Sequence, residues 1–131
     1  KGFLSRDITV RDLIEIKGDV HHVFPRDYLK RQGLKKGQYN QIANYVYMQS
    51  EINIAIGNKA PRIYMQELVH QCQGGSTRYG GITDPAQLRE NFDMNCVPES
   101  LLEAPDENYD AFLKERRQLM AQKIRCYYTA L

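Results

Sequence analysis

The sequence of 131 residues has no tryptophan and only three cysteines, Cys72, Cys96 and Cys126. Because these cysteines are odd in number, widely spaced and without a CxxC pair, they argue against a disulfide framework or a zinc knuckle and indicate a reducing cytoplasm. No apolar run approaches the roughly 18 residues of a membrane span, and no secretory signal is recognisable. These absences, with a hydrophobic content of 42%, predict one globular domain in the cytoplasm and no membrane partner.

Acidic residues are concentrated in one segment of the chain. Residues 84–110 carry eight acidic side chains and one basic side chain, although the formal net charge of the whole sequence is +2. The rest of the sequence therefore carries an excess of nine positive charges. A field of that sign attracts polyanions, so the distribution favours a nucleic acid as partner.

Helical patterns dominate the chain. Thr9 with Asp12, Ser50 and Asp84 are predicted to cap the starts of helices, and Gly33 is predicted to end one. These signals predict helices over residues 10–16, 25–32, 50–58, 61–71 and 85–92. A longer amphipathic helix is expected over residues 109–131, packed along one face. The apolar stripe of that helix consists of Tyr109, Phe112, Leu113, Met120, Ile124, Tyr127 and Leu131.

Two short β-branched runs interrupt the helical patterns. DVHHVFP predicts a strand of about four residues that Pro25 ends, and YVYMQ predicts a second strand. Residues 33–38 read as a polar loop and residues 98–105 as an acidic linker. The glycine-rich residues 71–84 are expected to form a flexible connector, with a flap that closes over DNA as the alternative. The fold class is therefore α+β, mostly helical, with a short two-stranded hairpin.

Polar side chains recur at fixed intervals through residues 19–59. His21 and His22 stand at the end of the first strand, Pro25 follows three residues later, Asn44 begins the second strand, and Asn53 lies nine residues further in a helix. Adjacent residues on a strand point to opposite faces. Both histidines can therefore serve one site only where the strand ends, and Pro25 provides such an end.

These residues resemble a known nuclease motif. HHVFP, NYVYMQSEIN and IGNKAP are similar to the HNH, or ββα-metal, endonuclease motif. In that motif an acidic residue or His is followed by His, x, x, Pro, and then by two Asn at this spacing; many members have Asp where His21 stands. GNKAPRIY, the acidic linker and FLKERRQLMAQKI extend the resemblance to the C-terminal nuclease domain of GmrSD-like, modification-dependent restriction proteins. In those proteins a ParB-like nucleotide-hydrolysing domain precedes the nuclease.

The resemblance implies a domain organisation and an activity. Residues 1–131 would form one HNH-like nuclease domain, with a ββα-metal core at 19–59 and a helical extension at 60–131. The domain would be the C-terminal part of a longer protein, which the start at Lys1 rather than Met also suggests. The implied activity is metal-dependent hydrolysis of DNA in a cytoplasmic bacterial restriction or defence system.

The resemblance also implies roles for single residues. His22 would be the general base, because imidazole accepts a proton near neutral pH, and Asn44 would brace the loop that orients it. His21 and Asn53 would bind one divalent ion. Both ligands are neutral, so Mn or Ni is favoured over Mg, unless Asp19 supplies a charge.

Basic residues outside the core motif are candidates for DNA contacts. Lys59 follows the core helix, and Lys114, Arg117 and Arg125 share a face of the last helix, for which a solvated face is the alternative. His70 is expected to be a partly buried structural residue. Two other functions stay open: a catalytically inactive ββα module that binds DNA or regulates a partner, and a helical interaction domain whose histidines bind a structural metal.

Overall fold

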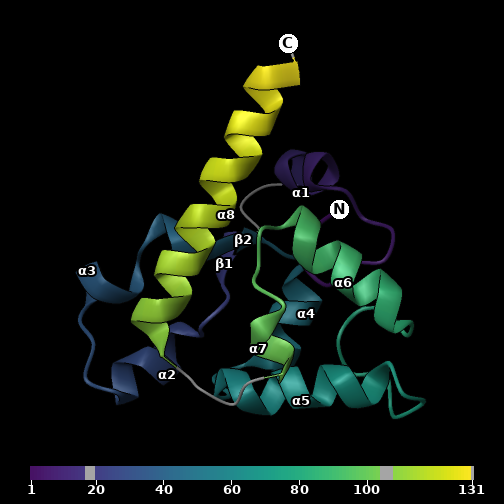
Figure 1. Ribbon diagram of the computed structural model, residues 1–131. Helices are drawn as coiled ribbons and strands as arrows, with labels where there is room; N and C mark the ends of the chain where they lie inside the picture. Colours follow the sequence, from purple (N-terminus) through teal and green to yellow (C-terminus); the bar gives the residue numbers. More distant parts are fainter. Residues whose placement is uncertain (17–19, 104–107, 131) are drawn as a thin grey trace.

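The computed structural model describes residues 1–16, 20–103 and 108–130 and shows a mostly helical α+β fold (Figure 1). This confirms the fold class predicted from the sequence. The two strands are β1 (Val20–His22) and β2 (Tyr45–Tyr47). Helices surround them: α1 (Val10–Ile16), α2 (Arg26–Arg31), α3 (Lys36–Tyr39), the 3₁₀ helix η1 (Ile42–Asn44), α4 (Ser50–Ile56), α5 (Pro61–Gln71), α6 (Pro85–Met94), α7 (Ser100–Glu103) and α8 (Tyr109–Ala130).

The hairpin is antiparallel and regular. Its register pairs Val20 with Tyr47, His21 with Val46, and His22 with Tyr45. Residues directly opposite one another on an antiparallel pair share a face. His21 therefore lies on the face of Val46, which is buried in the core, and His22 lies on the opposite face.

The first residues of the chain are part of the core, which the sequence patterns did not indicate. Phe3 and Leu4 are fully buried, and the Phe3 N–H donates to the carbonyl of Tyr47 at 2.8 Å. The buried amide of Asn91 on α6 holds this segment. Its Oδ1 accepts from the N–H of Leu4 at 2.8 Å, and its Nδ2 donates to the carbonyl of Gly2 at 3.0 Å. The N-terminal segment thus links β2 to α6.

Local capping signals were good predictors in most places. Thr9 and Asp12 form the expected reciprocal pair at the start of α1, each backbone N–H donating to the other's side chain at 3.1 Å. Ser50 is the first residue of α4 rather than its cap, because Gln49 occupies the capping position. The expected polar loop and acidic linker contain the short helices α3 and α7, which are too brief to show a periodic pattern.

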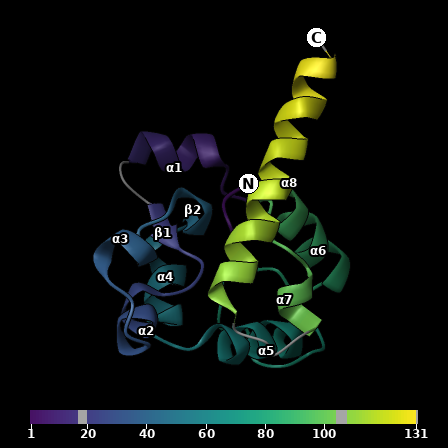
Figure 2. The same ribbon diagram turned by 60° about the vertical axis from the view of Figure 1, so that its left-hand side comes forward.

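Only the first turns of α8 pack against the body. Phe112 stacks on Phe24 with ring centroids 4.7 Å apart, and Leu113 is also buried. Beyond Met120 every described residue is exposed, and Ile124 and Tyr127 have 57% and 65% of their surface accessible. Figures 1 and 2 show this half of α8 projecting beyond the other elements. The prediction of a stripe packed along the whole helix was therefore wrong beyond Met120, and Leu131 lies outside the described residues.

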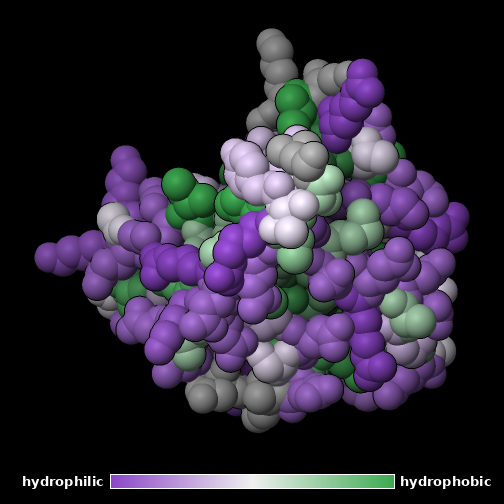
Figure 3. Space-filling view, turned by 45° about the horizontal axis from the view of Figure 1, so that its top comes forward, coloured by the Kyte–Doolittle hydropathy of each residue, from purple (hydrophilic) through white to green (hydrophobic). Residues whose placement is uncertain are grey.

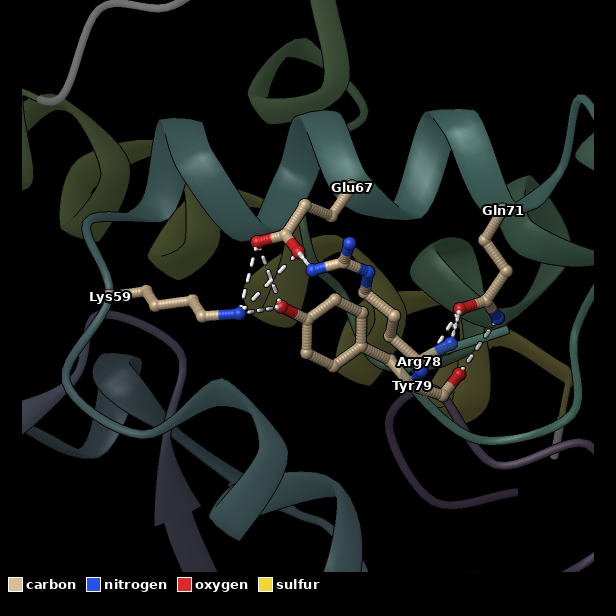
Figure 4. Close-up of polar contacts among 5 residues, drawn as sticks. All are labelled: Lys59, Glu67, Gln71, Arg78 and Tyr79. Carbon is tan, nitrogen blue, oxygen red and sulfur yellow. Dashed lines mark hydrogen bonds and ion pairs between the residues drawn. The ribbon is translucent and has the colours of Figure 1, made fainter. Parts of the chain in front are cut away.

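Hydrogen bonds hold part of the glycine-rich segment after α5 in place (Figure 4). The buried amide of Gln71 accepts from the backbone N–H groups of Arg78 and Tyr79, both at 2.9 Å, and donates to the carbonyl of Tyr79 at 2.9 Å. The Tyr79 side chain is fully buried. The flexible connector expected from the glycines was wrong for this half of the segment, because one amide satisfies the backbone groups there.

A charged cluster supports the same segment (Figure 4). The Lys59 ammonium donates to Glu67 at 3.1 Å and to the Tyr79 hydroxyl at 2.9 Å, and Arg78 pairs with Glu67 at 2.5 Å. Burial by itself would raise the pKa of the Glu67 carboxyl, but the hydrogen bonds from Lys59 and Tyr79 and the two nearby cations lower that pKa overall. The hydrogen bond to Tyr79 is the main reason that the pKa of Lys59 is raised.

None of the helices in the described part of the chain is long and apolar enough to cross a membrane.

Glu67→Gln should make the free energy of unfolding less dependent on pH in the acidic range. The depressed pKa means that Glu67 stabilises the folded state above its ordinary pKa of 4.5, and that this stabilisation is lost as the pH falls below that value. At pH 7 we expect the variant to lose about 1–2 kcal/mol in the free energy of unfolding, and progressively less in acid. Urea denaturation at several pH values measures this. The exposed Glu90→Gln on α6 is the control, and an equal loss from Glu67→Gln at every pH would contradict the ion-pair account.

Candidate functional site

The buried side chain of Asn44 fastens the turn that follows β1. Its Oδ1 accepts from the N–H of Phe24 at 2.8 Å, and its Nδ2 donates to the carbonyl of Phe24 at 3.1 Å and to that of Tyr39 at 3.3 Å. The backbone carbonyl of Asn44 accepts from Val23 at 2.9 Å. Asn44 thus has the bracing geometry that the motif predicts, and it sets where the chain leaves β1.

His22 stands at the end of β1 with a defined partner. Its Nε2 lies 2.9 Å from Oδ1 of Asn40, and its ring packs edge-on against Tyr45 at 5.0 Å between centroids. An amide oxygen can only accept, so Nε2 donates to Asn40 in the tautomer that carries the ring proton on Nε2. The lone pair of Nδ1 then remains as the basic site of the ring. A general base needs an unprotonated ring nitrogen of this kind.

Asn40 is the functional candidate that the sequence patterns missed. It is the C-cap residue of α3, a helix of four residues that was expected to be a loop. Its N–H donates to the carbonyl of Lys36 at 3.0 Å, which fixes its backbone beside the hairpin. No periodic or spacing signal distinguished it from the neighbouring polar residues.

His21 and Asn53, the predicted metal ligands, are both half-buried. His21 shares its face of the hairpin with Val46, whose side chain joins Ile52 and Ile56 of α4 in the core. Asn53 follows Ile52 on α4 at the border of its buried stripe. His21 and Asn53 therefore both adjoin the core to which Val46, Ile52 and Ile56 belong, while His22 lies on the opposite face of the hairpin.

The donor set determines which ion the site suits. Among the described residues, no three His, Cys, Asp or Glu side chains gather closely enough to hold a metal. Asp19, the carboxylate considered for this role, lies outside the described residues. An imidazole nitrogen and an amide oxygen bring no negative charge. They fit a weakly held ion of the Mn or Ni type better than Mg.

The predicted basic residues have different surroundings. Lys59 is engaged with Glu67 and Tyr79, so its contact with a phosphate stays a prediction and would compete with these partners. Lys114, Arg117 and Arg125 are exposed on α8. His70 is exposed on α5, so the expectation that it is partly buried was wrong.

The proximal half of α8 lies against the loop that holds His22. The Arg117 guanidinium donates to Oε1 of Gln41, next to Asn40, at 3.2 Å. The Tyr109 hydroxyl donates to the carbonyl of Gln38 at 2.8 Å. A polar hollow of about 560 Å³ lies between these residues and α2. Arg117 therefore brings one positive charge of α8 next to the loop that contains Asn40.

Arg116 is a second residue that the patterns missed. It is 5% exposed and donates to the carbonyls of Ala43 at 3.0 Å, Tyr45 at 2.5 Å and Asn95 at 3.1 Å. Burial lowers the pKa of its guanidinium. Its place on the apolar stripe of α8, between Leu113 and Met120, was a usable signal that this arginine is buried.

Comparison with known proteins gives one distant match. The protein MJ0686 of Methanocaldococcus jannaschii, described as uncharacterised, is 23% identical to this chain over 114 residues. The match covers 79% of the chain but 20% of the archaeal protein, so the chain spans about a fifth of this relative's length. No family model and no solved structure matches the chain. The case for a function therefore rests on the residues of the site.

Asn44→Ala should destabilise the fold by about 2–4 kcal/mol. The change leaves the buried N–H of Phe24 without its acceptor and removes two donated hydrogen bonds, and buried polar groups left unpaired are costly. Urea denaturation gives the free energy of unfolding. Asn58→Ala, at an exposed position after α4, is the matched control. A loss below about 0.5 kcal/mol for Asn44→Ala would mean that the brace is dispensable.

Proposed function

We propose that this chain is a metal-dependent DNA endonuclease domain that hydrolyses phosphodiester bonds, with His22 as the general base. The observation that carries the proposal is the orientation of His22. Its Nε2–H points at Asn40 from the end of a strand, and Asn44 fastens the following turn. The motif resemblance supplies the reaction class, and this geometry supports the role of the base.

In the proposed hydrolysis, one residue transfers a proton and two others hold that residue in position. Nδ1 of His22 accepts a proton from a water molecule as that water attacks phosphorus, and the bond from phosphorus to the leaving oxygen breaks. The resulting imidazolium keeps its Nε2–H bond to Oδ1 of Asn40, so the ring holds its orientation through the proton transfer. Asn40 and Asn44 are positioning residues in this scheme.

A divalent ion would neutralise the phosphate and assist the leaving oxygen. His21 and Asn53 are the residues proposed to hold it. Because the two ligands are neutral, a substrate phosphate would add the charge that the protein side lacks. We therefore expect Mn or Ni to bind the free protein better than Mg.

The proposed partner is DNA, bound along the exposed basic face of α8 and contacted by Lys59. Lys114, Arg117 and Arg125 lie on this face, and Arg117 sits beside the loop of His22. The resemblance to GmrSD-like proteins adds the proposal of a cytoplasmic bacterial restriction or defence protein with a ParB-like nucleotide-hydrolysing domain before the nuclease.

One observation favours a second candidate function, a ββα module that binds DNA or regulates a partner without cleaving it. The regular register places His21 and His22 on opposite faces of the hairpin. The two residues can therefore meet one phosphate only beyond the end of β1. If no substrate reaches that position, the module binds DNA without hydrolysis.

Nicking of a supercoiled plasmid with Mg, Mn or Ni separates the two functions. His22→Ala should lower the nicking rate by about 10²–10⁴-fold, because that is the usual contribution of a general base. His70→Ala, which alters an exposed histidine on α5, is the matched control and should nick at the native rate.

Two results would count against the nuclease. A His22→Ala protein that nicks within about threefold of the native rate would exclude His22 as the base. DNA binding by the native protein with no nicking under any of the three metals would favour the non-catalytic module.

A further inference from the structure

The distal part of α8, residues 121–130, forms a projecting segment that we call the α8 arm. Each of its residues is exposed, and Figures 1 and 2 show it extending past the rest of the molecule. Lys123 near its base donates to the carbonyl of Met94 at 2.8 Å. A single exposed helical end of this length gains little stability in water by itself, so its side chains are available to a partner.

The arm has an unusual chemical composition. The arm has two basic residues, Lys123 and Arg125, and no acidic one. Tyr127 and Tyr128 near the tip are 65% and 67% exposed, and their rings meet edge to face with centroids 5.6 Å apart. Two accessible aromatic rings therefore stand one turn beyond Lys123 and Arg125. In Figure 3, which brings this end of the molecule forward, hydrophobic and hydrophilic side chains are mixed on the surface.

Positive charge beside exposed rings fits one kind of partner best. Proteins that hold single-stranded nucleic acid use cationic side chains for the phosphates and aromatic rings on which unpaired bases stack. In a duplex the bases already stack on one another, so the exposed tyrosine rings have no free base face on which to stack. A purely apolar docking face would lack the charges of Lys123 and Arg125.

We propose that the α8 arm binds single-stranded DNA, with unpaired bases stacked on Tyr127 and Tyr128 and phosphates contacted by Lys123 and Arg125. This inference rests on the proposed function and narrows its substrate to DNA with an unpaired stretch. The arm is joined to the candidate site by one continuous helix. Arg117, which contacts the loop of His22, lies ten residues before Tyr127, or about 15 Å along the helix axis.

Fluorescence anisotropy with a labelled single-stranded oligonucleotide, and with the same strand in a duplex, tests the proposal. EDTA is present, so binding is measured without metal or cleavage. The native protein should bind the single strand more tightly than the duplex. Tyr127→Ala and Tyr128→Ala should each weaken single-strand binding about five- to tenfold and leave duplex binding unchanged, because stacking needs an unpaired base.

Three further variants sharpen the test. Tyr127→Phe keeps the ring and should bind within about twofold of the native protein. Tyr47→Ala alters a partly exposed tyrosine on the hairpin, away from the arm, and should bind normally. Arg125→Ala should weaken binding to both forms of DNA and reduce the slope of log affinity against log salt concentration by about 0.7 for the single strand.

The outcomes distinguish failure of the proposal for the α8 arm from failure of the proposed nuclease activity. Single-strand binding that is unchanged in a protein with both Tyr127→Ala and Tyr128→Ala would overturn the proposal for the arm, and so would a native preference for duplex. Such a result together with His22-dependent nicking would leave the nuclease in place. Tyrosine-dependent binding without any nicking would instead support the arm and reject the proposed cleavage.

Discussion

The amide of Asn44 is the contact on which the rest of the candidate site depends. It is fully buried, and each of its hydrogen-bonding atoms is engaged by the backbone around the hairpin. A buried amide is stable only when its partners are in place, so this group selects one path for the chain after β1. Neighbouring elements meet at the same loop: α8 reaches it through Tyr109 and Arg116, and α3 ends at Asn40 beside it. The position of His22 follows from these restraints.

Many elements of the fold could be predicted from local sequence signals, because helix caps, prolines and short β-branched runs act over a few residues. The hairpin, α1, α5 and α6 were predicted from such signals. The packing of the N-terminal segment was not, because it depends on the amide of Asn91, which is 87 residues from Leu4 in the sequence. The extent of packing along α8 was also missed. A helical stripe shows which face can be buried, but it does not show whether another element is there to cover it.

The candidate site was predicted in part. The resemblance to the HNH motif singled out His21, His22, Asn44 and Asn53 as a set, and the structure places these four residues on the hairpin, η1 or α4. The partner of His22 could not be found in this way, since Asn40 acts through the C-terminal end of an unpredicted helix. Arg116 was overlooked because arginines are usually exposed, although its position in the stripe of α8 indicated burial. Lys59 was treated as a free cation because Glu67, its partner, lies eight residues away, on α5.

The proposed function requires a divalent ion at His21 and Asn53, near the end of β1 where His22 stands. NMR spectra recorded during a titration with substoichiometric Mn²⁺ test it without relying on catalysis, since the ion broadens the signals of nearby nuclei. We expect the earliest broadening at His21, His22 and Asn53, with His21→Ala abolishing it. Broadening that begins instead at the acidic residues of α6 and α7, such as Asp93 and Glu103, and persists in the His21→Ala protein would contradict the proposal.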